Sequence, residues 1–420
     1  MSKPDREVFA EASERECTVV PGSGLEIFTA FLLLGLTSFG GPIAHLGYFR
    51  QEFVERRRWL TDKAYADLVA LCQFLPGPAS SQVGFALGLR RGGVRGGLLA
   101  WLAFTLPSAL LLVAFAMGAS LFHGPVGEGL LSGLKIVAVA IVAHAVWGMS
   151  SKLCPDPTRA GIALAALLLV LLAGTPLAQV GAIGLGAVAG LILCRRLPIA
   201  EAGGENAGAV VRSRQTGRTL GVLAGGLFIV LLLLLPVLAQ LSDQQGFRLA
   251  DAFYRAGALV FGGGHVVLPL LEAEVVKSGW VSADAFLAGY GAAQAVPGPL
   301  FTFAAYLGAV GADSPNALSG AGIALVMIFL PGMLVLLAVL PVWNRVSAWR
   351  SVQAALHGVN AAVVGLLGAV LYHPVWTGSI TGVKEFALAL TCFFLLTVWR
   401  CPAWLVVIVA AGGGVLVSNV

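Results

Sequence analysis

The sequence predicts an all-α integral membrane protein of about 12–13 transmembrane segments, built as two inverted repeats whose helices break or re-enter at Pro-Gly-Pro. Three observations lead to this prediction: an apolar composition, apolar runs of membrane-spanning length, and an internal repeat. Hydrophobic residues make up 58% of the 420 residues and charged residues only 11%, with a mean hydropathy of +0.89. A water-soluble domain of this composition would aggregate.

The membrane-spanning elements are expected to be helices. The run 220–241 is apolar throughout, whereas a barrel strand would alternate in polarity over about ten residues. Apolar segments begin near Leu25, Ala64, Gly96, Gly129, Ala160, Leu177, Leu220, Ala250, Ala285, Leu318, Val352, Phe386 and Ala403. The segments near Ala64 and Ala285 are interrupted, so each is either a full span or a re-entrant hairpin.

An internal repeat organises the chain. Five short motifs recur in the same order in both halves, and the spacing from tryptophan to glutamine is identical in the two copies. The paired positions are 39–42 and 261–264, 59–61 and 280–282, 73–78 and 294–299, 106–107 and 330–331, and 133–135 and 358–360. A single extra span between the copies would insert the second with opposite orientation, which is the inverted-repeat plan of many secondary transporters.

The repeat and the distribution of polar residues divide the chain into five parts. These are a polar N-terminal tail (1–24), a first repeat (25–194), a polar loop (195–218), an extra connecting span (219–241) and a second repeat (248–420). The tail lacks the basic start and apolar core of a cleaved signal, so the first span is expected to target the protein to the membrane.

Basic residues predict which loops face the cytoplasm. They cluster at Arg90–Arg95, in the loop 195–218, near Arg350 and at Arg400, and this places the N-terminus inside. The basic loop 48–63 disagrees, because it would then lie outside. It returns to the cytoplasmic side only if the segment around Pro76 is re-entrant.

The two Pro-Gly-Pro elements are the first candidate for a binding site. Proline removes a backbone donor and glycine tolerates unusual dihedral angles, so each element should split its helix. The half-helix that follows begins with free N–H groups at the positive end of its dipole, which suits an anion. A structural kink is the alternative interpretation. Recurrence of the break in both halves favours a transport site near the bilayer midplane.

The glycine-rich turns 39–42 and 261–264 are a second candidate. Each has a histidine beside it, His45 or His265, that can donate a hydrogen bond or accept a proton. The alternative is that the glycines permit close helix packing and that the histidines are structural.

Charged residues inside the spans point to the sign of the ligand. Lys135 lies several residues inside an apolar segment, where a cation is costly, although it can also snorkel to the surface. We expect no carboxylate deep in any span, because Asp67, Asp251 and Glu385 are assigned to segment ends. The candidate anion-binding residues are Gly40, Gly41, His45, Gln73, Pro76, Gly77, Pro78, Ser80, Ser81, Gln82, Lys135, Gly262, Gly263, His265, Gln294, Pro297, Gly298, Pro299 and Thr302.

Other classes of function lack their motifs. The six cysteines form no C-x-x-C pair, so we expect no disulfide framework, no metal site and no cofactor. There is no G-x-x-x-x-G-K-[ST] phosphate loop, so transport would be secondary or passive. An intramembrane enzyme would need a catalytic constellation that is missing here, and a scaffold would not need paired broken helices. The basic clusters are explained by membrane orientation and not by nucleic acid.

These motifs together resemble the chromate ion transporter family. The resemblance rests on F-G-G-P followed by a histidine, R-R-x-W, and L-P-G-P with polar residues after it, and on F-G-G-G-H and P-G-P-L-F-T-F in the second half. It spans nearly the whole chain and implies the long, two-domain type. It implies export of chromate through the inner (cytoplasmic) membrane, driven by membrane potential, a proton gradient or both. Sulfate is the alternative substrate, and a homodimer is compatible with the sequence.

Overall fold

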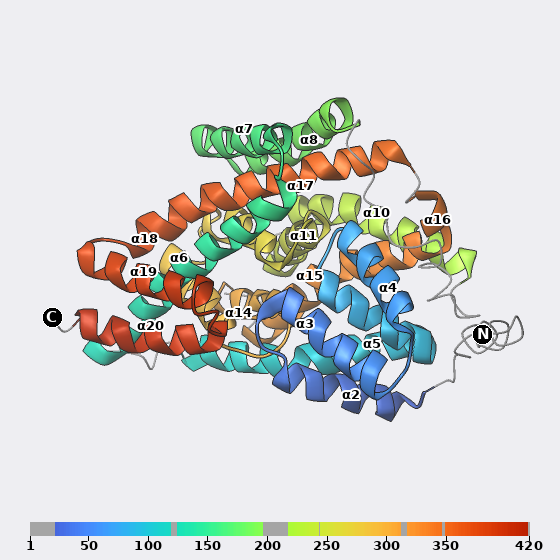
Figure 1. Cartoon of the computed structure of the whole chain (residues 1–420), viewed down its shortest axis with the longest axis horizontal. Coiled ribbons are helices and arrows are strands. Elements are labelled where there is room, and N and C mark those ends of the chain that lie inside the picture. Colours follow the sequence, from blue (N-terminus) through green and yellow to red (C-terminus); the bar gives the residue numbers. More distant parts are fainter. Residues whose placement is uncertain are drawn as a thin grey trace, which may run out of the picture.

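The computed structural model describes residues 22–118, 124–195, 217–242, 244–311, 317–346 and 349–418, and within them every regular element is a helix (Figure 1). The predicted tail 1–24 and polar loop 195–218 fall almost entirely outside these residues. The all-α prediction is confirmed.

The first repeat contains seven labelled helices and one π-helical turn among the described residues. They are α2 (Gly24–Thr37), α3 (Gly41–Arg50), η1 (Gln51–Arg56), α4 (Asp62–Phe74), α5 (Ala79–Gly118), α6 (Pro125–Leu153), α7 (Pro157–Ala173) and α8 (Pro176–Leu193). The connecting helix is α10 (Arg218–Leu241).

The second repeat has the same order of elements, but several of its helices are divided into shorter helices. Its elements are α11 (Gln245–Ala258), η3 (Gly264–Val266), α12 (Val267–Leu271), η4 (Glu272–Val276), α13 (Ala283–Ala293), η5 (Leu300–Thr302), α14 (Phe303–Val310), α15 (Ala317–Val339), η6 (Leu340–Val342), α16 (Trp343–Val346), α17 (Arg350–Val370), η7 (Leu371–Trp376), α18 (Thr377–Ser379), α19 (Val383–Thr397) and α20 (Ala403–Ser418).

Matching N-caps start α4 and α13. The Thr61 hydroxyl accepts a hydrogen bond from the Ala64 N–H, and the Ser282 hydroxyl accepts one from the Ala285 N–H. Each cap satisfies a backbone donor that would otherwise have no partner at the helix start. The two helices therefore begin at equivalent positions of the repeat.

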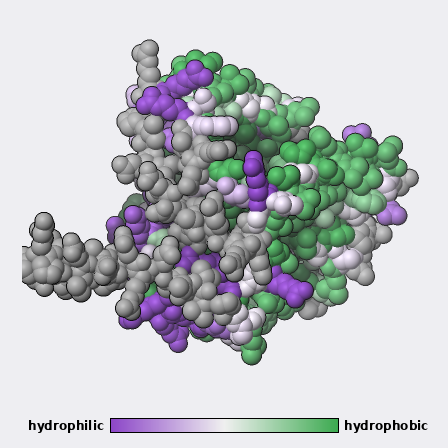
Figure 2. Space-filling model, turned by 90° about the vertical axis from the view of Figure 1, so that its right-hand side faces the viewer, coloured by the Kyte–Doolittle hydropathy of each residue, from purple (hydrophilic) through white to green (hydrophobic). Residues whose placement is uncertain are grey.

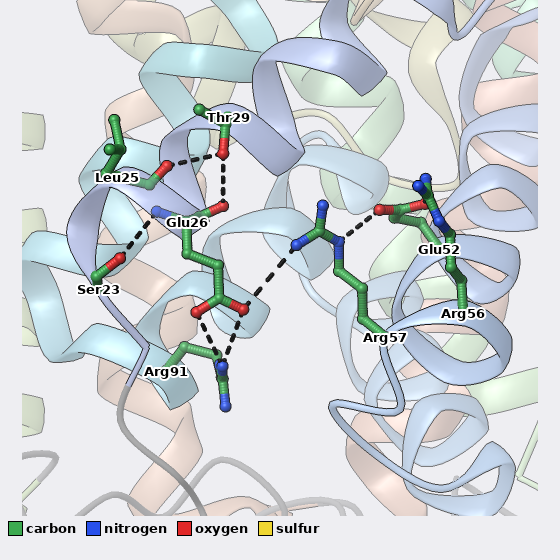
Figure 3. A network of polar contacts seen from close by, with 8 residues as sticks. All are labelled: Ser23, Leu25, Glu26, Thr29, Glu52, Arg56, Arg57 and Arg91. Carbon is green, nitrogen blue, oxygen red and sulfur yellow. Dashed lines mark hydrogen bonds and ion pairs between the residues drawn. The ribbon is translucent and has the colours of Figure 1, made fainter.

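A network of ion pairs holds the bases of the first repeat's short helices at one face of the molecule. Arg91 lies 3.1 Å from Glu26, and Arg57 contacts both Glu26 and Glu52 (Figure 3). The Gly22 N–H also donates to the Arg91 carbonyl oxygen at 3.1 Å. The start of α2, the end of η1 and the end of the first part of α5 therefore share one face, which we call face A.

The short helices of the first repeat enter from face A and return to it. The 13 residues of α4 give about 20 Å of helix, less than the roughly 30 Å of hydrocarbon. The helix α5 has non-helical dihedral angles at Gly92 and Gly93 and crosses only after this bend. This is the re-entrant alternative of the prediction. The basic loop 48–63 lies on face A with Arg91, and its conflict with the other basic clusters disappears.

The second repeat is anchored at the opposite face, which we call face B. Arg255 of α11 lies 2.8 Å from Glu274 of η4, and Gln245 donates to the Gly311 carbonyl oxygen at 2.7 Å. The start of α11 thus lies at the end of α14, and the last turn of α11 lies beside η4. Face B is opposite face A because α5 crosses from face A, so α6 begins on the other side. The early turns of α6 approach the first turn of α13, which therefore also lies on that side. The two repeats are therefore inverted.

The terminal helices of each repeat pack on the other repeat. In Figure 1, α7 and α8 lie along α17, and α19 and α20 lie beside α6. Glycine residues allow these close contacts because they have no side chain. A Cβ on Gly133 would lie 2.2 Å from the Ala410 carbonyl oxygen, and a Cβ on Gly358 would lie 2.0 Å from the Gly186 carbonyl oxygen. Gly133 and Gly358 are equivalent residues, so the exchange is reciprocal.

The lateral surface is apolar. Five stretches of the described chain are long and apolar enough to cross a membrane: α5, α6, α10, Ala317–Val342 and Arg350–Ser379. Leu241 and Val222 of α10 are 81% and 69% exposed, which only lipid would tolerate over a whole helix. Figure 2, an end view, shows a broad hydrophobic flank with hydrophilic residues gathered away from it. The chain is a multi-pass membrane protein.

The assignment of Asp251 to a segment end is wrong. Asp251 is the seventh residue of α11 and is only 7% exposed, whereas the sequence assigned it to a segment end. The helix begins at Gln245, earlier than the apolar run near Ala250. Arg255, one turn later, lies 3.1 Å from Asp251 and compensates its charge.

Candidate functional site

The two Pro-Gly-Pro breaks are joined by reciprocal backbone hydrogen bonds between the repeats. The Gly77 N–H donates to the Val260 carbonyl oxygen at 2.8 Å, and the Gly298 N–H donates to the Ser38 carbonyl oxygen at 2.9 Å. Val260 and Ser38 each precede the Phe-Gly-Gly turn of their own repeat. Each break is therefore seated on the glycine turn of the other repeat, and the four predicted motifs meet in one region.

Glycine is required at the centre of each break. Gly77 has φ +117° and Gly298 has φ +103°, in the region that disfavours residues with a Cβ. A Cβ on Gly77 would lie 2.9 Å from Gly332 Cα, and one on Gly298 would lie 2.8 Å from Ser108 Oγ. Ser108 and Gly332 are equivalent positions of the repeat, so this approach is reciprocal too.

The predicted glycine turns also depend on positive φ. Gly40 and Gly41 have φ of +100° and +76°, and Gly262 and Gly263 have φ of +79° and +147°. These conformations reverse the chain between the half-helices of each hairpin. The glycines are needed for the turn itself, independently of any contact with a ligand.

Backbone donors at the start of α5 lie at the first break. The first helical bond at this end runs from Gln82 N to the Pro78 carbonyl oxygen at 2.9 Å. The N–H groups of Ala79, Ser80 and Ser81 come before it and have no partner in the helix. Ser80 and Ser81 are 3% and 4% exposed. After the second break the helical hydrogen bonds begin one residue earlier, because the Thr302 N–H donates to the Pro299 carbonyl oxygen at 3.0 Å.

Three buried hydroxyl groups of this region have no hydrogen-bond partner among the described residues: Ser38, Ser81 and Thr105. All three are at most 4% exposed. Thr105 was missed by the sequence analysis, although the Leu-Pro motif that follows it was recognised as part of the repeat. The Thr105 carbonyl oxygen accepts from Ser108 at 3.1 Å, which ties this residue to the position facing Gly298.

Other predicted polar residues have structural partners. Gln82 Nε2 donates to the carbonyl oxygens of Pro76 and Gly332, both at 2.9 Å, so its donor is occupied by backbone. Thr302 Oγ1 donates to the Pro299 carbonyl oxygen at 2.7 Å, inside its own turn. Both side chains stabilise the breaks. Their hydrogens are not free for an anion in this arrangement.

The two histidines differ in their surroundings. His45 is fully buried, and its ring meets Phe104 edge to face with centroids 5.4 Å apart. His265 lies 2.8 Å through Nδ1 from the Tyr290 hydroxyl. Both ring nitrogens of His45 lack a hydrogen-bond partner among the described residues, whereas His265 is hydrogen-bonded to Tyr290.

Lys135 lies away from the breaks. Its Nζ is 3.0 Å from Asp284 in the first turn of α13. Gln294, which precedes the second break, is ten residues further along the chain, or about 15 Å of helix. Gln73, before the first break, is exposed at the end of α4, while Gln294 is partly buried. The structure therefore brings together the glycine turns and the breaks, and leaves Lys135 outside.

No three His, Cys, Asp or Glu side chains of the described ranges gather as metal ligands. The chemistry of the region is that of neutral donors, namely backbone N–H groups and hydroxyls. Such a set is suited to holding an anion without burying several full charges.

Comparison with known proteins assigns this architecture to a family. A family model described as chromate transporter matches residues 25–191 and 247–415, one segment in each repeat. The chain belongs to the chromate transporter family. A probable chromate transport protein of Synechococcus elongatus is 28% identical over 397 residues, covering 92% of this chain and 93% of that protein. No solved structure matches the chain.

Two further members of the chromate transporter family cover most of both chains. The chromate transport protein of Pseudomonas aeruginosa is 30% identical over 365 residues, or 84% of this chain and 82% of that protein. The chromate transport protein of Cupriavidus metallidurans is 29% identical over 347 residues, or 81% and 80%. The similarity therefore extends over both repeats.

Proposed function

We propose that this protein exports chromate, a tetrahedral dianion, across the cytoplasmic membrane from face A to face B. The observation that carries the proposal is the set of buried donors without partners at the Pro-Gly-Pro crossing, namely the hydroxyls of Ser38, Ser81 and Thr105 and the N–H groups that start α5. The names of the relatives supply the substrate.

An anion explains why these donors are left unpaired. A buried donor without a partner costs about 1–3 kcal/mol, so several in one region need a ligand to satisfy them. A dianion stripped of water needs many strong hydrogen bonds, and charge-assisted bonds are stronger than neutral ones. The positive end of the α5 half-helix adds favourable electrostatics.

Face A is suited to collecting an anion. Arg56, Arg57 and Arg91 surround the two glutamates of the network in Figure 3, so these five side chains carry a net positive charge. A basic surface raises the local concentration of anions. We place face A in the cytoplasm because of its basic residues.

The membrane potential is sufficient to drive export. A dianion leaving a cell at about 100 mV, inside negative, gains roughly 4.6 kcal/mol, twice the energy per single charge. A flux experiment must determine whether a proton gradient also drives export. Chromate flux in inverted vesicles with an imposed potential, with and without a pH gradient, separates the two contributions.

Chromate-dependent thermal stabilisation tests the site. A ligand at 100 times its dissociation constant stabilises a protein by about 2.7 kcal/mol, and the Ser38→Ala, Ser81→Ala double variant should lose most of the resulting shift in melting temperature. The matched control is Ser150→Ala with Ser151→Ala, whose hydroxyls bond to carbonyl oxygens of their own helix. Equal stabilisation of wild type and the site variant would place the anion elsewhere. Sulfate in place of chromate measures the preference between tetrahedral dianions.

A further inference from the structure

The two repeats are not equally packed, and the difference lies on two helix pairs that should be equivalent. In one pair, α13 of the second repeat packs on α6 of the first. In the equivalent pair, α4 would pack on α17, yet among the described residues these two helices have no comparable contact. We propose that the α6–α13 contact is a closed gate at face B, that the α4–α17 pair is the open gate at face A, and that transport exchanges the two arrangements. This inference rests on the proposed transport function.

The closed gate combines a close backbone approach with an ion pair. A Cβ on Gly291 of α13 would lie 2.3 Å from the Leu134 carbonyl oxygen of α6, so only glycine permits this contact. The next residue of α6, Lys135, lies 3.0 Å from Asp284 at the base of α13. Asp284 is 72% exposed and Lys135 is 23% exposed, so the pair lies at the surface end of the contact.

The open gate is visible as exposure at equivalent positions. Leu287 of α13 is 0% exposed, whereas its equivalent on α4, Ala66, is exposed. The face of α4 that is equivalent to this buried part of α13 is therefore uncovered in the first repeat. Its occupant in the exchanged state is α17, the counterpart of α6.

Sequence differences between the repeats favour the present arrangement. At the positions of Lys135 and Asp284, the other pair of helices has Asn360 and Lys63, which cannot form an ion pair. An exposed ion pair shifts a two-state equilibrium by about two- to fivefold. At the position of Gly291 the other helix has Ala70, whose methyl group obstructs the equivalent close approach. Both differences stabilise the state that is closed at face B and open at face A.

Two cysteine probes report the two gates. In protein whose natural cysteines are replaced, Ala66→Cys reports face A and Leu287→Cys reports face B, with a membrane-impermeant maleimide applied to vesicles of known orientation. We expect rapid labelling of the first probe from face A only, and protection of the second. Because maleimide reacts with a hydrated thiolate, slow labelling of the Ala66→Cys probe from both faces would mean that lipid covers α4, and would overturn the proposal.

Weakening the closed gate should shift labelling reciprocally. Gly291→Ala should increase labelling of the Leu287→Cys probe several-fold and decrease that of the Ala66→Cys probe by a similar factor. If Gly291→Ala does not fold, Lys135→Asn tests the ion pair alone, with a shift of about two- to fivefold. The charge exchange Lys135→Asp with Asp284→Lys should restore wild-type labelling.

Strengthening the open gate supplies the matched control. Ala70→Gly with Asn360→Asp gives the α4–α17 pair the features of the closed gate, and should also expose the Leu287→Cys probe. Unchanged labelling of both probes in every variant would refute the gate. None of these measurements requires substrate, so a failure of chromate to stabilise the protein would reject the proposed function and leave the gate standing.

Discussion

Gly77 in the first repeat donates its N–H to the carbonyl oxygen of Val260 in the second repeat, across 2.8 Å. The equivalent bond from Gly298 to Ser38 returns in the other direction at 2.9 Å. Each Pro-Gly-Pro break therefore forms a backbone hydrogen bond with the other repeat. The candidate site therefore depends on both repeats, and a substitution of either glycine should disturb both breaks.

Gly77→Ala should destabilise the protein and abolish transport. A residue with a Cβ at positive φ costs at least about 1–2 kcal/mol, and here the Cβ would also lie 2.9 Å from the Gly332 backbone. Gly298→Ala should be milder, because its Cβ would meet the Ser108 side chain, which can rotate. Thermal unfolding in detergent and vesicle flux measure the two effects. Gly47→Ala, with no atom within 4 Å of the new Cβ, is the control, and equal effects at Gly47 and Gly77 would contradict the argument.

Gln82→Glu should be more harmful than Gln82→Met. The amide of Gln82 bridges the carbonyl oxygens of Pro76 and Gly332, and a carboxylate would present negative charge to both. Loss of a buried hydrogen-bond partner costs about 1–3 kcal/mol, and more for a charged group. The methionine variant loses the bonds without the repulsion. Melting temperatures without substrate should fall in the order wild type, Gln82→Met, Gln82→Glu; the reverse order of the two variants would show that the amide is not a bridge.

The repeat and the location of the breaks were predictable because they are written in local motifs. Pro-Gly-Pro cannot continue a helix wherever it occurs, and its recurrence marks equivalent positions. Which residues the breaks contact was not predictable, because Val260 and Ser38 are distinguished only by the folded arrangement. Asp251 was misplaced since hydropathy finds apolar runs, whereas α11 begins five residues before one. The sequence left two interpretations of Lys135 open, an anion contact and snorkelling to the surface, and could not show its ion pair because Asp284 is 149 residues away in the chain.

Gly133→Ala and Gly358→Ala should each loosen the exchange of terminal helices. The added Cβ atoms would lie 2.2 Å and 2.0 Å from carbonyl oxygens of α20 and α8, and overpacking of this kind costs about 1–3 kcal/mol. Gly148→Ala in α6, with no atom within 4 Å, is the matched control. Unfolding in detergent at increasing denaturant should rank both variants below Gly148→Ala. A stability of Gly133→Ala equal to that of the control would mean that α6 and α20 are not tightly packed.

Arg57→Cys and Lys277→Cys should be labelled from opposite sides of the membrane. Arg57 lies in the face A network at the end of η1, and Lys277 is at the end of η4, the equivalent element of the inverted second repeat. An impermeant maleimide applied to right-side-out and inverted vesicles distinguishes the sides. We expect Arg57→Cys to react in inverted vesicles and Lys277→Cys in right-side-out ones. Labelling of both from the same side would exclude inverted repeats.

Cutting the chain between residues 205 and 206 should leave a functional protein when both fragments are co-expressed. The first fragment carries α7 and α8, which pack on α17, and the second carries α19 and α20, which pack on α6. Each fragment thus supplies the helices that cover an apolar surface of the other, in addition to the Gly77–Val260 and Gly298–Ser38 bonds. We expect the fragments to copurify through a tag on one of them and to restore chromate resistance together.

Either fragment alone should aggregate in detergent, since an uncovered α6 or α17 has no partner. Removal of α19 and α20 from the second fragment is the control and should abolish copurification or weaken it strongly. Monodisperse, stable fragments in isolation would show that the repeats are independent domains and that the reciprocal contacts do not hold them together.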